Sequence, residues 1–399
     1  MALNVRHPVW LPAAPAPSIR VFAVLYMLET FARASLATVI PIQAFDLLGS
    51  EQTVSFLYTA VALIAFGFSL VIPLLIGRLT RKWVYTLGAV LLVGAAVALA
   101  SQSVAGQIAG MAVRVMGTAC LNVALNLYVL DHVRREDFVP YDSTRLAYAT
   151  VGWTVAPYLG VWLYANHGIW PVYALSAGAA VLLLAVFWYL RLSATTIIAK
   201  GSSKPATPIG YVGRFIGQPR LRLAWLIAFG RSSFWSTFFI YGPILMVATG
   251  QGEEAGGILV SLGNVMLVTT IWWGKLSGRT GVRWLTAFAF AAASVMLLVA
   301  GLIGSTLPWV TAAILLGATI FIVPLDAVGG VPFYRSVHRS ERAEMAAVYR
   351  SYMDFGELLP PLVYGVLLAF FGLGIVFVAM SALLLFCAAM SWRYLPKRL

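Results

Sequence analysis

Charged side chains stand inside some of the most apolar stretches of this 399-residue chain. Placing one charge at the centre of a bilayer costs about 2.5 to 3.5 kcal/mol, so each such residue needs a counter-ion or water. Glu29 and Arg33 are four residues apart and would share one face of a helix, where they can pair. A proton taken up by Glu29 would release Arg33. The spacing therefore predicts either a proton-coupling carboxylate or a permanent structural ion pair.

Further embedded ions are Arg114, Arg231 and Asp326, and Asp354 with Glu357 three residues later. Two carboxylates so close compete, and we expect one of Asp354 and Glu357 to keep a proton if both are embedded. In the alternative, Arg350 and Asp354 lie in water at the end of their helix. Arg145 and Asp142 are predicted to be solvated loop charges. Uncharged polar residues predicted to complete a hydrated site include Asn122, Asn126 and Trp235.

Other chemistry has no support in the sequence. A glycine-rich phosphate loop with its lysine is absent, and so is the Gly-x-Ser-x-Gly turn of a nucleophilic serine. The 4 histidines are scattered and the 2 cysteines lie inside apolar runs, so neither type predicts a metal site. We therefore predict neither an enzyme nor a cofactor.

The elements that must position the embedded ions are long apolar segments. The chain is 61% hydrophobic and 10% charged, which is typical of membrane proteins and unlike soluble enzymes. Twelve segments are long enough to cross about 30 Å of hydrocarbon. They are residues 20–46, 54–77, 83–101, 104–130, 144–165, 169–191, 221–249, 256–274, 283–304, 308–332, 347–371 and 374–394.

The basic residues fall in every second loop and at both termini. By the positive-inside rule, both termini and the middle loop should be cytoplasmic, and the number of spans should be even. The net charge of +13 is thus a topology signal and does not indicate a nucleic-acid partner. Residues 1–19 are interpreted as a cytoplasmic tail, because no small-residue cleavage site separates them from the first span.

The longest polar stretch divides the spans six and six. We predict an N-terminal bundle at 20–192, a cytoplasmic linker at 193–220 and a C-terminal bundle with a short tail at 221–399. Two weak internal matches lie about half of the chain apart, which indicates duplication. One pairs the loop that follows Gly77 with the loop that follows Gly274. The other pairs Arg145, Pro157 and Gly160 with Arg350, Pro361 and Gly365.

These features resemble those of the major facilitator superfamily (MFS). The family's loop signature is matched in part by Gly77, Leu79, Thr80 and Lys82, and better by Gly274, Leu276, Ser277, Arg279, Gly281 and Arg283. The resemblance assigns a gating role to these loops, with Gly77, Arg78, Arg81, Gly274 and Arg279 as the predicted residues. In both copies the usual Asp is replaced, by Arg81 and by Gly278. Arg114 with Gly117 resembles the helix 4 signature of drug and proton antiporters. The exporter signature of helix 5 remains as Gly152, Pro157 and Gly160; with Pro361 and Gly365, these residues are predicted hinges or close-packing sites.

The resemblance implies an all-α fold of twelve transmembrane helices in two pseudo-symmetric bundles, with helices 1, 4, 7 and 10 around a central cavity. Each of these four helices carries an ionisable residue. The predicted substrate-binding residues are Arg33, Arg114, Asn122, Asn126, Arg231, Trp235 and Asp326. The predicted proton-coupling residues are Glu29, Asp326, Asp354 and Glu357.

The function predicted from these features is proton-coupled export of a small anionic, zwitterionic or amphipathic organic compound by alternating access. A proton-linked importer of an organic anion and a lipid-handling relative remain alternatives. The predicted partners are the substrate, protons and membrane lipids, with a monomeric protein. A bacterial inner membrane is the expected location because the loops are short.

Overall fold

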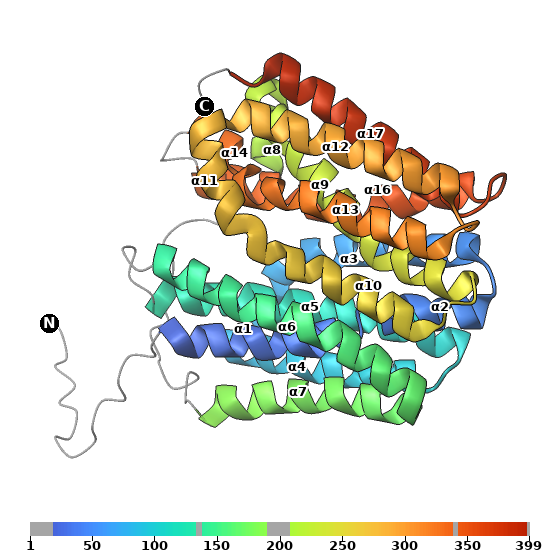
Figure 1. The fold of residues 1–399 in the computed structure, drawn as a ribbon. Helices are drawn as coiled ribbons and strands as arrows, with labels where there is room; N and C mark the ends of the chain where they lie inside the picture. Colours follow the sequence, from blue (N-terminus) through green and yellow to red (C-terminus); the bar gives the residue numbers. More distant parts are fainter. Residues whose placement is uncertain (1–18, 133–137, 190–207, 338–341, 397–399) are drawn as a thin grey trace, which may run out of the picture.

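The computed structural model describes residues 19–132, 138–189, 208–337 and 342–396, and within these ranges the chain is helical with no β-strand. Residues 1–18 of the predicted tail and most of the predicted linker 193–220 lie outside the described residues. The helices run along one another to form a bundle, and their ends gather at two opposite edges (Figure 1). This arrangement confirms the predicted all-α class.

The first half of the chain corresponds to the first six predicted spans. Its helices are α1 (Ile19–Ala34), α2 (Val39–Leu48), α3 (Glu51–Arg78), α4 (Arg81–Ala100), α5 (Val104–His132), α6 (Phe138–His167) and α7 (Ile169–Tyr189). The first predicted span is therefore broken, with a turn at residues 35–38 between α1 and α2. Pro41 explains the break, because proline has no N–H to bond back to Ala37 in a continuous helix.

The second half contains the other six predicted spans. Its helices are α8 (Pro208–Gly217), α9 (Pro219–Ala248), α10 (Glu253–Val265), α11 (Thr270–Thr280), α12 (Val282–Ile303), α13 (Pro308–Val328), α14 (Val331–Ser336), α15 (Arg342–Tyr349), α16 (Ser351–Leu367) and α17 (Gly374–Tyr394). Helix α8 lies in the predicted linker and was not predicted. The eighth span is bent, because a 3-10 turn at Met266–Thr269 joins α10 to α11.

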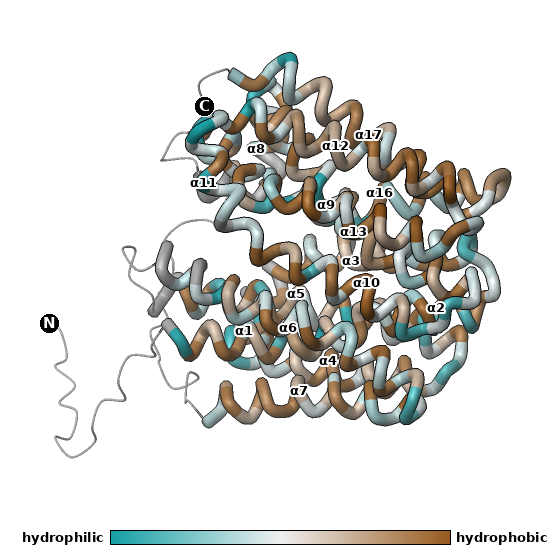
Figure 2. Tube along the Cα trace, in the orientation of Figure 1, coloured by the Kyte–Doolittle hydropathy of each residue, from teal (hydrophilic) through white to brown (hydrophobic). Residues whose placement is uncertain are grey.

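Helix length and composition agree with a protein that spans a membrane. Nine helices in the described ranges are long and apolar enough to cross a bilayer, and the bent pair α10–α11 raises the number to ten. The two remaining predicted spans, 144–165 and 347–371, are helical as α6 and as α15–α16. Both contain internal prolines, and α16 alone is 17 residues long. Apolar residues cover the middle of the bundle, and polar residues gather near its ends (Figure 2).

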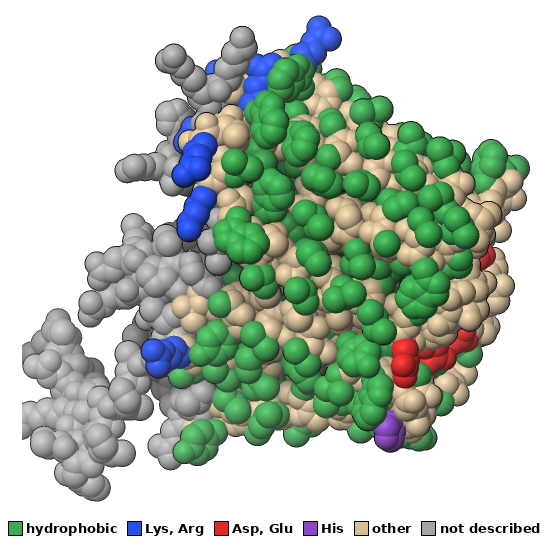
Figure 3. All heavy atoms as spheres, viewed as in Figure 1, with side chains coloured by type: hydrophobic (Ala, Val, Ile, Leu, Met, Phe, Trp, Pro, Cys, Tyr) green, Lys and Arg blue, Asp and Glu red, His purple; other side chains and the backbone are tan. Residues whose placement is uncertain are grey.

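The two ends of the bundle carry opposite charges. Figure 3 shows lysine and arginine along one edge and acidic side chains at the opposite edge. We define the basic end by Arg78, Lys275, Arg279, Arg335 and Arg393, all exposed, and the acidic end by Asp46, Glu51, Glu253 and Glu254. The alternation of loop charge read from the sequence therefore separates two physical ends of the molecule.

The two halves share a hydrophobic core only near the acidic end. Between them, α10 packs along α6 and α3 packs along α16. The largest core cluster joins α2 residues such as Val39 and Ile42 to α9 residues such as Ile244 and Leu245. The remaining core of the first half, around Tyr85 and Phe187, forms a separate cluster, and two small clusters of the second half lie apart from it. Among the described residues, the buried core thus joins the halves near the acidic end, whereas farther toward the basic end they meet through the Phe66 ring of α3 and the Phe355 ring of α16, whose centres are 6.0 Å apart.

Candidate functional site

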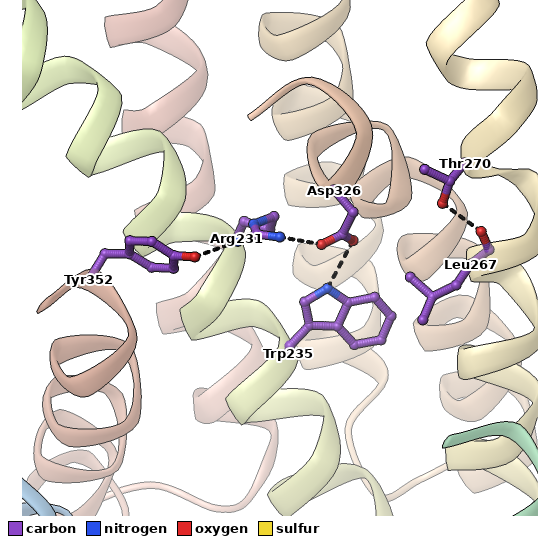
Figure 4. Close-up of polar contacts among 6 residues, drawn as sticks. All are labelled: Arg231, Trp235, Leu267, Thr270, Asp326 and Tyr352. Atoms are coloured by element: carbon purple, nitrogen blue, oxygen red, sulfur yellow. Dashed lines mark hydrogen bonds and ion pairs between the residues drawn. The ribbon is translucent and has the colours of Figure 1, made fainter. Parts of the chain in front are cut away.

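An ion pair connects two helices of the second half. Arg231 of α9 forms a salt bridge with Asp326 of α13 (Figure 4). Trp235 lies one turn after Arg231, and its Nε1 donates to the other carboxylate oxygen of Asp326 at 3.2 Å. Arg231 also donates to the Tyr352 hydroxyl of α16 at 3.1 Å and lies 5.7 Å from the centre of that ring. The cluster ties α9 to both α13 and α16.

The ion pair is not fully enclosed by the protein. The side chains of Arg231 and Asp326 are 22% and 19% exposed, although both stand on helices that would cross the bilayer. Partial hydration together with several hydrogen bonds is what makes an intramembrane ion pair tolerable. The sequence predicted Arg231, Trp235 and Asp326 as site residues, and the structure brings the three together. Tyr352 was missed, because a lone tyrosine near a helix start gives no distinguishing signal.

The first half carries a different ion pair. Arg33 Nε lies 3.4 Å from Glu29 Oε1 on the same helix, as the spacing predicted. Glu29 is fully buried, whereas Arg33 is 19% exposed. Neither carboxylate oxygen of Glu29 has a hydrogen-bond partner among the described residues. The pair is therefore held by charge alone, without the supporting hydrogen bonds of the Arg231–Asp326 pair.

Arg114 of α5 is placed by the break between α1 and α2. The last carbonyls of a helix lack partners, and a cation near them is favourable. Here Arg114 Nη2 donates to the carbonyl oxygen of Arg33 at 3.1 Å, and Ser176 donates to the carbonyl oxygen of Ala32 at 2.7 Å. Arg114 is half-buried and has no salt bridge to a described carboxylate.

The position of Arg145 differs from the predicted solvated loop. The residue lies within α6, half-buried, with its guanidinium 4.7 Å from the centre of the Tyr26 ring. It also exerts an electrostatic effect on Glu29. The prediction of a solvated loop charge was wrong because α6 starts several residues before the expected edge of the fifth span.

Glu357 lies on α16, a helix of the second half that packs on α3 of the first half. Its side chain is exposed in the middle of a helix that packs against α3 and α9. We call Glu29, Arg33, Arg114, Arg231, Asp326 and Glu357 the charged layer.

Other predicted site residues lie around this layer. Asp354 is half-buried one turn before Glu357, and Arg350 beside it is exposed. Asn122 and Asn126 are half-buried on α5, between Arg114 and the basic end. Neither asparagine is brought into the two ion pairs.

The predicted gating residues stand at the basic end. Gly77 and Arg78 end α3, and Arg81 begins α4. Gly274 and Arg279, expected at and after the end of the eighth span, lie within α11 instead. The prediction placed that span's end too early, because α11 continues as a polar helix to Thr280.

The predicted hinge residues are packing positions in this conformation. A Cβ on Gly160 would lie 1.8 Å from the Ser35 carbonyl oxygen, so only glycine lets α6 approach the break after α1. A Cβ on Gly365 would lie 2.9 Å from the Phe56 ring, and one on Gly152 would lie 3.3 Å from Thr30. Pro157 and Pro361 are buried inside α6 and α16.

Comparison with known proteins places this geometry in a family. The sequence matches the family model described as Major Facilitator Superfamily over residues 22–332. The chain belongs to the major facilitator superfamily. No curated protein matches the sequence significantly. The family assignment confirms the resemblance read from the sequence, while the narrower likeness to drug and proton antiporters stays a prediction.

Solved structures share the fold at low identity. The nucleoside transporter NupG aligns at a TM-score of 0.71 and 14% identity, covering 94% of this chain and 99% of that chain. A POT family transporter in complex with a thioalcohol-conjugated peptide aligns at 0.73 and 11%, covering 93% and 94%. A POT family transporter in complex with 5-aminolevulinic acid aligns at 0.72 and 13%, covering 93% and 95%. The twelve-helix MFS fold is thereby confirmed.

Proposed function

We propose that this MFS protein is a secondary active transporter that exports a small organic molecule by alternating access, driven by protons. The observation that carries the proposal is the charged layer, which places partly exposed ion-pair side chains inside membrane-spanning helices of both halves, while the shared core joins the halves near the acidic end. A solute carrier requires this arrangement, because its site must open to one compartment at a time.

Hydrogen bonds between the halves support closure of the acidic end. Ser55 of α3 and Tyr241 of α9 share a bond of 2.6 Å, and the Tyr158 amide of α6 donates to Ser261 of α10 at 3.0 Å. Asn166 at the end of α6 also donates to Glu254 at the start of α10. We infer that these contacts form an outer gate, and that bundles 20–192 and 221–399 rock as units when it opens.

Glu29 is our choice for the coupling residue. It is fully buried, is accompanied by Arg33 and Arg145, and lacks hydrogen bonds within the described chain. A carboxylate held by charge alone can trade its cation for a proton at little structural cost. Asp326 is the second candidate, since protonation there would release Arg231. The basic end should face the cytoplasm by the positive-inside rule, in a bacterial inner membrane and in a monomer.

Export is favoured by the helix 5 residues Gly152, Pro157 and Gly160, and import of an organic anion is the alternative direction. Reconstituted vesicles with an imposed pH gradient should accumulate substrate against its gradient in exchange for protons. Uptake with protons in the same direction would support the importer instead. Transfer of fluorescent lipid between leaflets, with no solute flux, would support the lipid-handling alternative. For variants that remove a charge of the layer, Arg222→Gln is a control, because Arg222 is exposed and lies nine residues before Arg231 on α9.

A further inference from the structure

One face of α9 carries a line of partly exposed side chains. Arg231, Trp235 and Phe239 follow one another at intervals of four residues, and all three are half-buried. Residues four apart share a face of a helix, so the three side chains lie along one line. Every residue from 240 to 246 is buried. The accessible line on α9 therefore ends at Phe239, where the shared core begins.

Three aromatic rings meet at the end of this line. The Trp235 and Phe239 rings have their centres 5.6 Å apart and their planes 24° apart. The Trp153 ring of α6 lies 5.4 Å from the Phe239 ring, with 33° between the planes. Trp153 belongs to the first half and Phe239 to the second, so this contact crosses from one half to the other. We call Trp153, Trp235 and Phe239 the aromatic cluster.

Trp153 points to the inside of the molecule. Val151 and Val155, two residues to either side of it on α6, are 60% and 50% exposed. Residues two apart lie on nearly opposite sides of a helix, so the Trp153 side chain turns away from that outer surface. It is half-buried, and its ring reaches α9. The aromatic cluster therefore lies between the helices and not on the outer surface of α6.

The aromatic cluster adjoins the ion pair of the second half. Trp235 donates to Asp326, and Figure 4 shows its indole ring beside the Arg231–Asp326 pair. Ring surface next to a few polar groups is the usual composition of a small-molecule site. Packing alone accounts for Phe234 and Phe238 of the same helix, whose side chains are sealed in the core at 1% and 2% exposure. The rings of the aromatic cluster differ because each keeps accessible surface.

We propose that the transported compound carries a planar aromatic ring that stacks on the aromatic cluster. This inference rests on the proposed transport function and narrows its substrate class by the ring, whatever the charge of the compound. The second half offers the Trp235 and Phe239 rings, and the first half offers the Trp153 ring. A substrate ring at this place contacts both halves.

The contact between the halves gives the aromatic cluster a mechanical consequence. Trp153 and Phe239 stand on different bundles, so their contact must change when the bundles rock against one another. A favourable ring pair is then lost. A substrate ring replaces part of that contact, because it supplies aromatic surface to the rings that separate. The substrate thus favours the conformational change that carries it.

The test uses purified full-length protein in vesicles and counterflow of labelled probes in matched pairs. The members of a pair have the same charge and differ only in whether the six-membered ring is aromatic or saturated. The pairs are phenylalanine with cyclohexylalanine, benzenesulfonate with cyclohexanesulfonate, and trimethylphenylammonium with trimethylcyclohexylammonium. In the charge form that the protein accepts, the aromatic member should exchange about two- to tenfold better.

Variants then assign this preference to the aromatic cluster. Trp153→Leu and Phe239→Leu should each reduce the ratio of aromatic to saturated exchange, whereas Trp153→Phe keeps a ring and should retain most of it. Trp235→Phe removes the hydrogen bond to Asp326 but keeps the ring, so the ratio should persist. Phe288→Leu on α12 is the matched control, because it removes a ring that stacks on Trp284 outside the aromatic cluster. A merely structural role would lower the exchange of both members equally.

Three results would overturn the inference. Equal exchange of the two members in every pair would do so and leave the transport function standing. An unchanged ratio in both Trp153→Leu and Phe239→Leu would show that the rings only pack. Absence of exchange for every probe would also overturn it, and transfer of fluorescent lipid in the same vesicles would then reject the transport function as well.

Discussion

The two ion pairs of the charged layer are built differently. The pair in the second half joins three helices, because Asp326 also accepts from Trp235 and Arg231 also donates to Tyr352. The pair in the first half stays within one helix, and Glu29 has no hydrogen bond in the described structure. A hydrogen-bond network in which every group has a partner favours one arrangement of its helices. A buried carboxylate without hydrogen bonds costs free energy, so a change of its protonation or of the helix arrangement is easier. We infer that the second half provides a rigid wall and the first half provides the exchangeable proton.

Breaking the Arg231–Asp326 pair should give the largest effect. Asp326→Leu leaves a mostly buried guanidinium without its partner, and we expect the free energy of unfolding to fall by about 3 kcal/mol. Denaturation in detergent would measure this loss. Arg231→Met combined with Asp326→Leu should restore most of the stability but not transport. Full stability in the single variant would contradict the rigid-wall interpretation.

Glu29→Gln tests whether the ion pair of the first half provides the exchangeable proton. Gln keeps the volume and polarity of the buried Glu29 side chain, and the pair has no supporting hydrogen bonds to lose, so the loss of stability should be smaller than that of Asp326→Leu. Accumulation driven by a pH gradient should be lost, while exchange without a gradient continues. Unchanged accumulation would remove Glu29 from the coupling mechanism and leave Asp326 as the candidate.

Gly160 of α6 packs against the turn between α1 and α2, which directly follows the Glu29–Arg33 pair. Gly160→Ala places a Cβ against the Ser35 carbonyl, and overpacking of this kind costs about 1 to 3 kcal/mol. Gly178→Ala on α7 is the matched control, because no atom lies within 4 Å of its added Cβ. Thermal unfolding of the two variants should separate them. Equal stability would mean that the contact between α6 and the break is looser than described.

The smallest effect is expected at the acidic end. Tyr241→Phe removes the hydrogen bond to Ser55 between the halves, worth about 1 kcal/mol, and should raise the population with an open outer gate about fivefold. Spin labels at Ala165→Cys on α6 and Ala248→Cys on α9 would report the separation of the two halves there. Identical distance distributions with and without the substitution would show that this bond does not hold the gate.

Much of the fold could be predicted from the sequence, because hydrocarbon imposes a strong constraint on span length and loop charge. Each of the twelve predicted segments is mostly helical where the structure describes it. The breaks were missed, since the turn at Ser35–Thr38 and the 3-10 turn before α11 are as apolar as the helices around them. Helix α8 was also missed, because it lies in a segment judged only by its polarity.

Part of the candidate site could also be predicted from the sequence. The spacing of Glu29 and Arg33 was sufficient to predict their pairing, because both lie on one helix. Rarity of charge in apolar segments indicated Arg231 and Asp326, but their partner Tyr352 depends on how α16 packs on α9. The link between Arg145 and Glu29 likewise depends on tertiary packing, which no local pattern encodes.

The central claim is that the charged layer opens toward the basic end and is sealed at the acidic end. Labelling of a Glu357→Cys variant with a membrane-impermeant maleimide, applied from each side of oriented vesicles, tests it most directly. Cys120 and Cys387 are both buried, so background labelling should be low. In the absence of substrate, the account predicts rapid labelling from the side of the basic end and protection from the other. Labelling from the side of the acidic end alone, or from neither side, would contradict it.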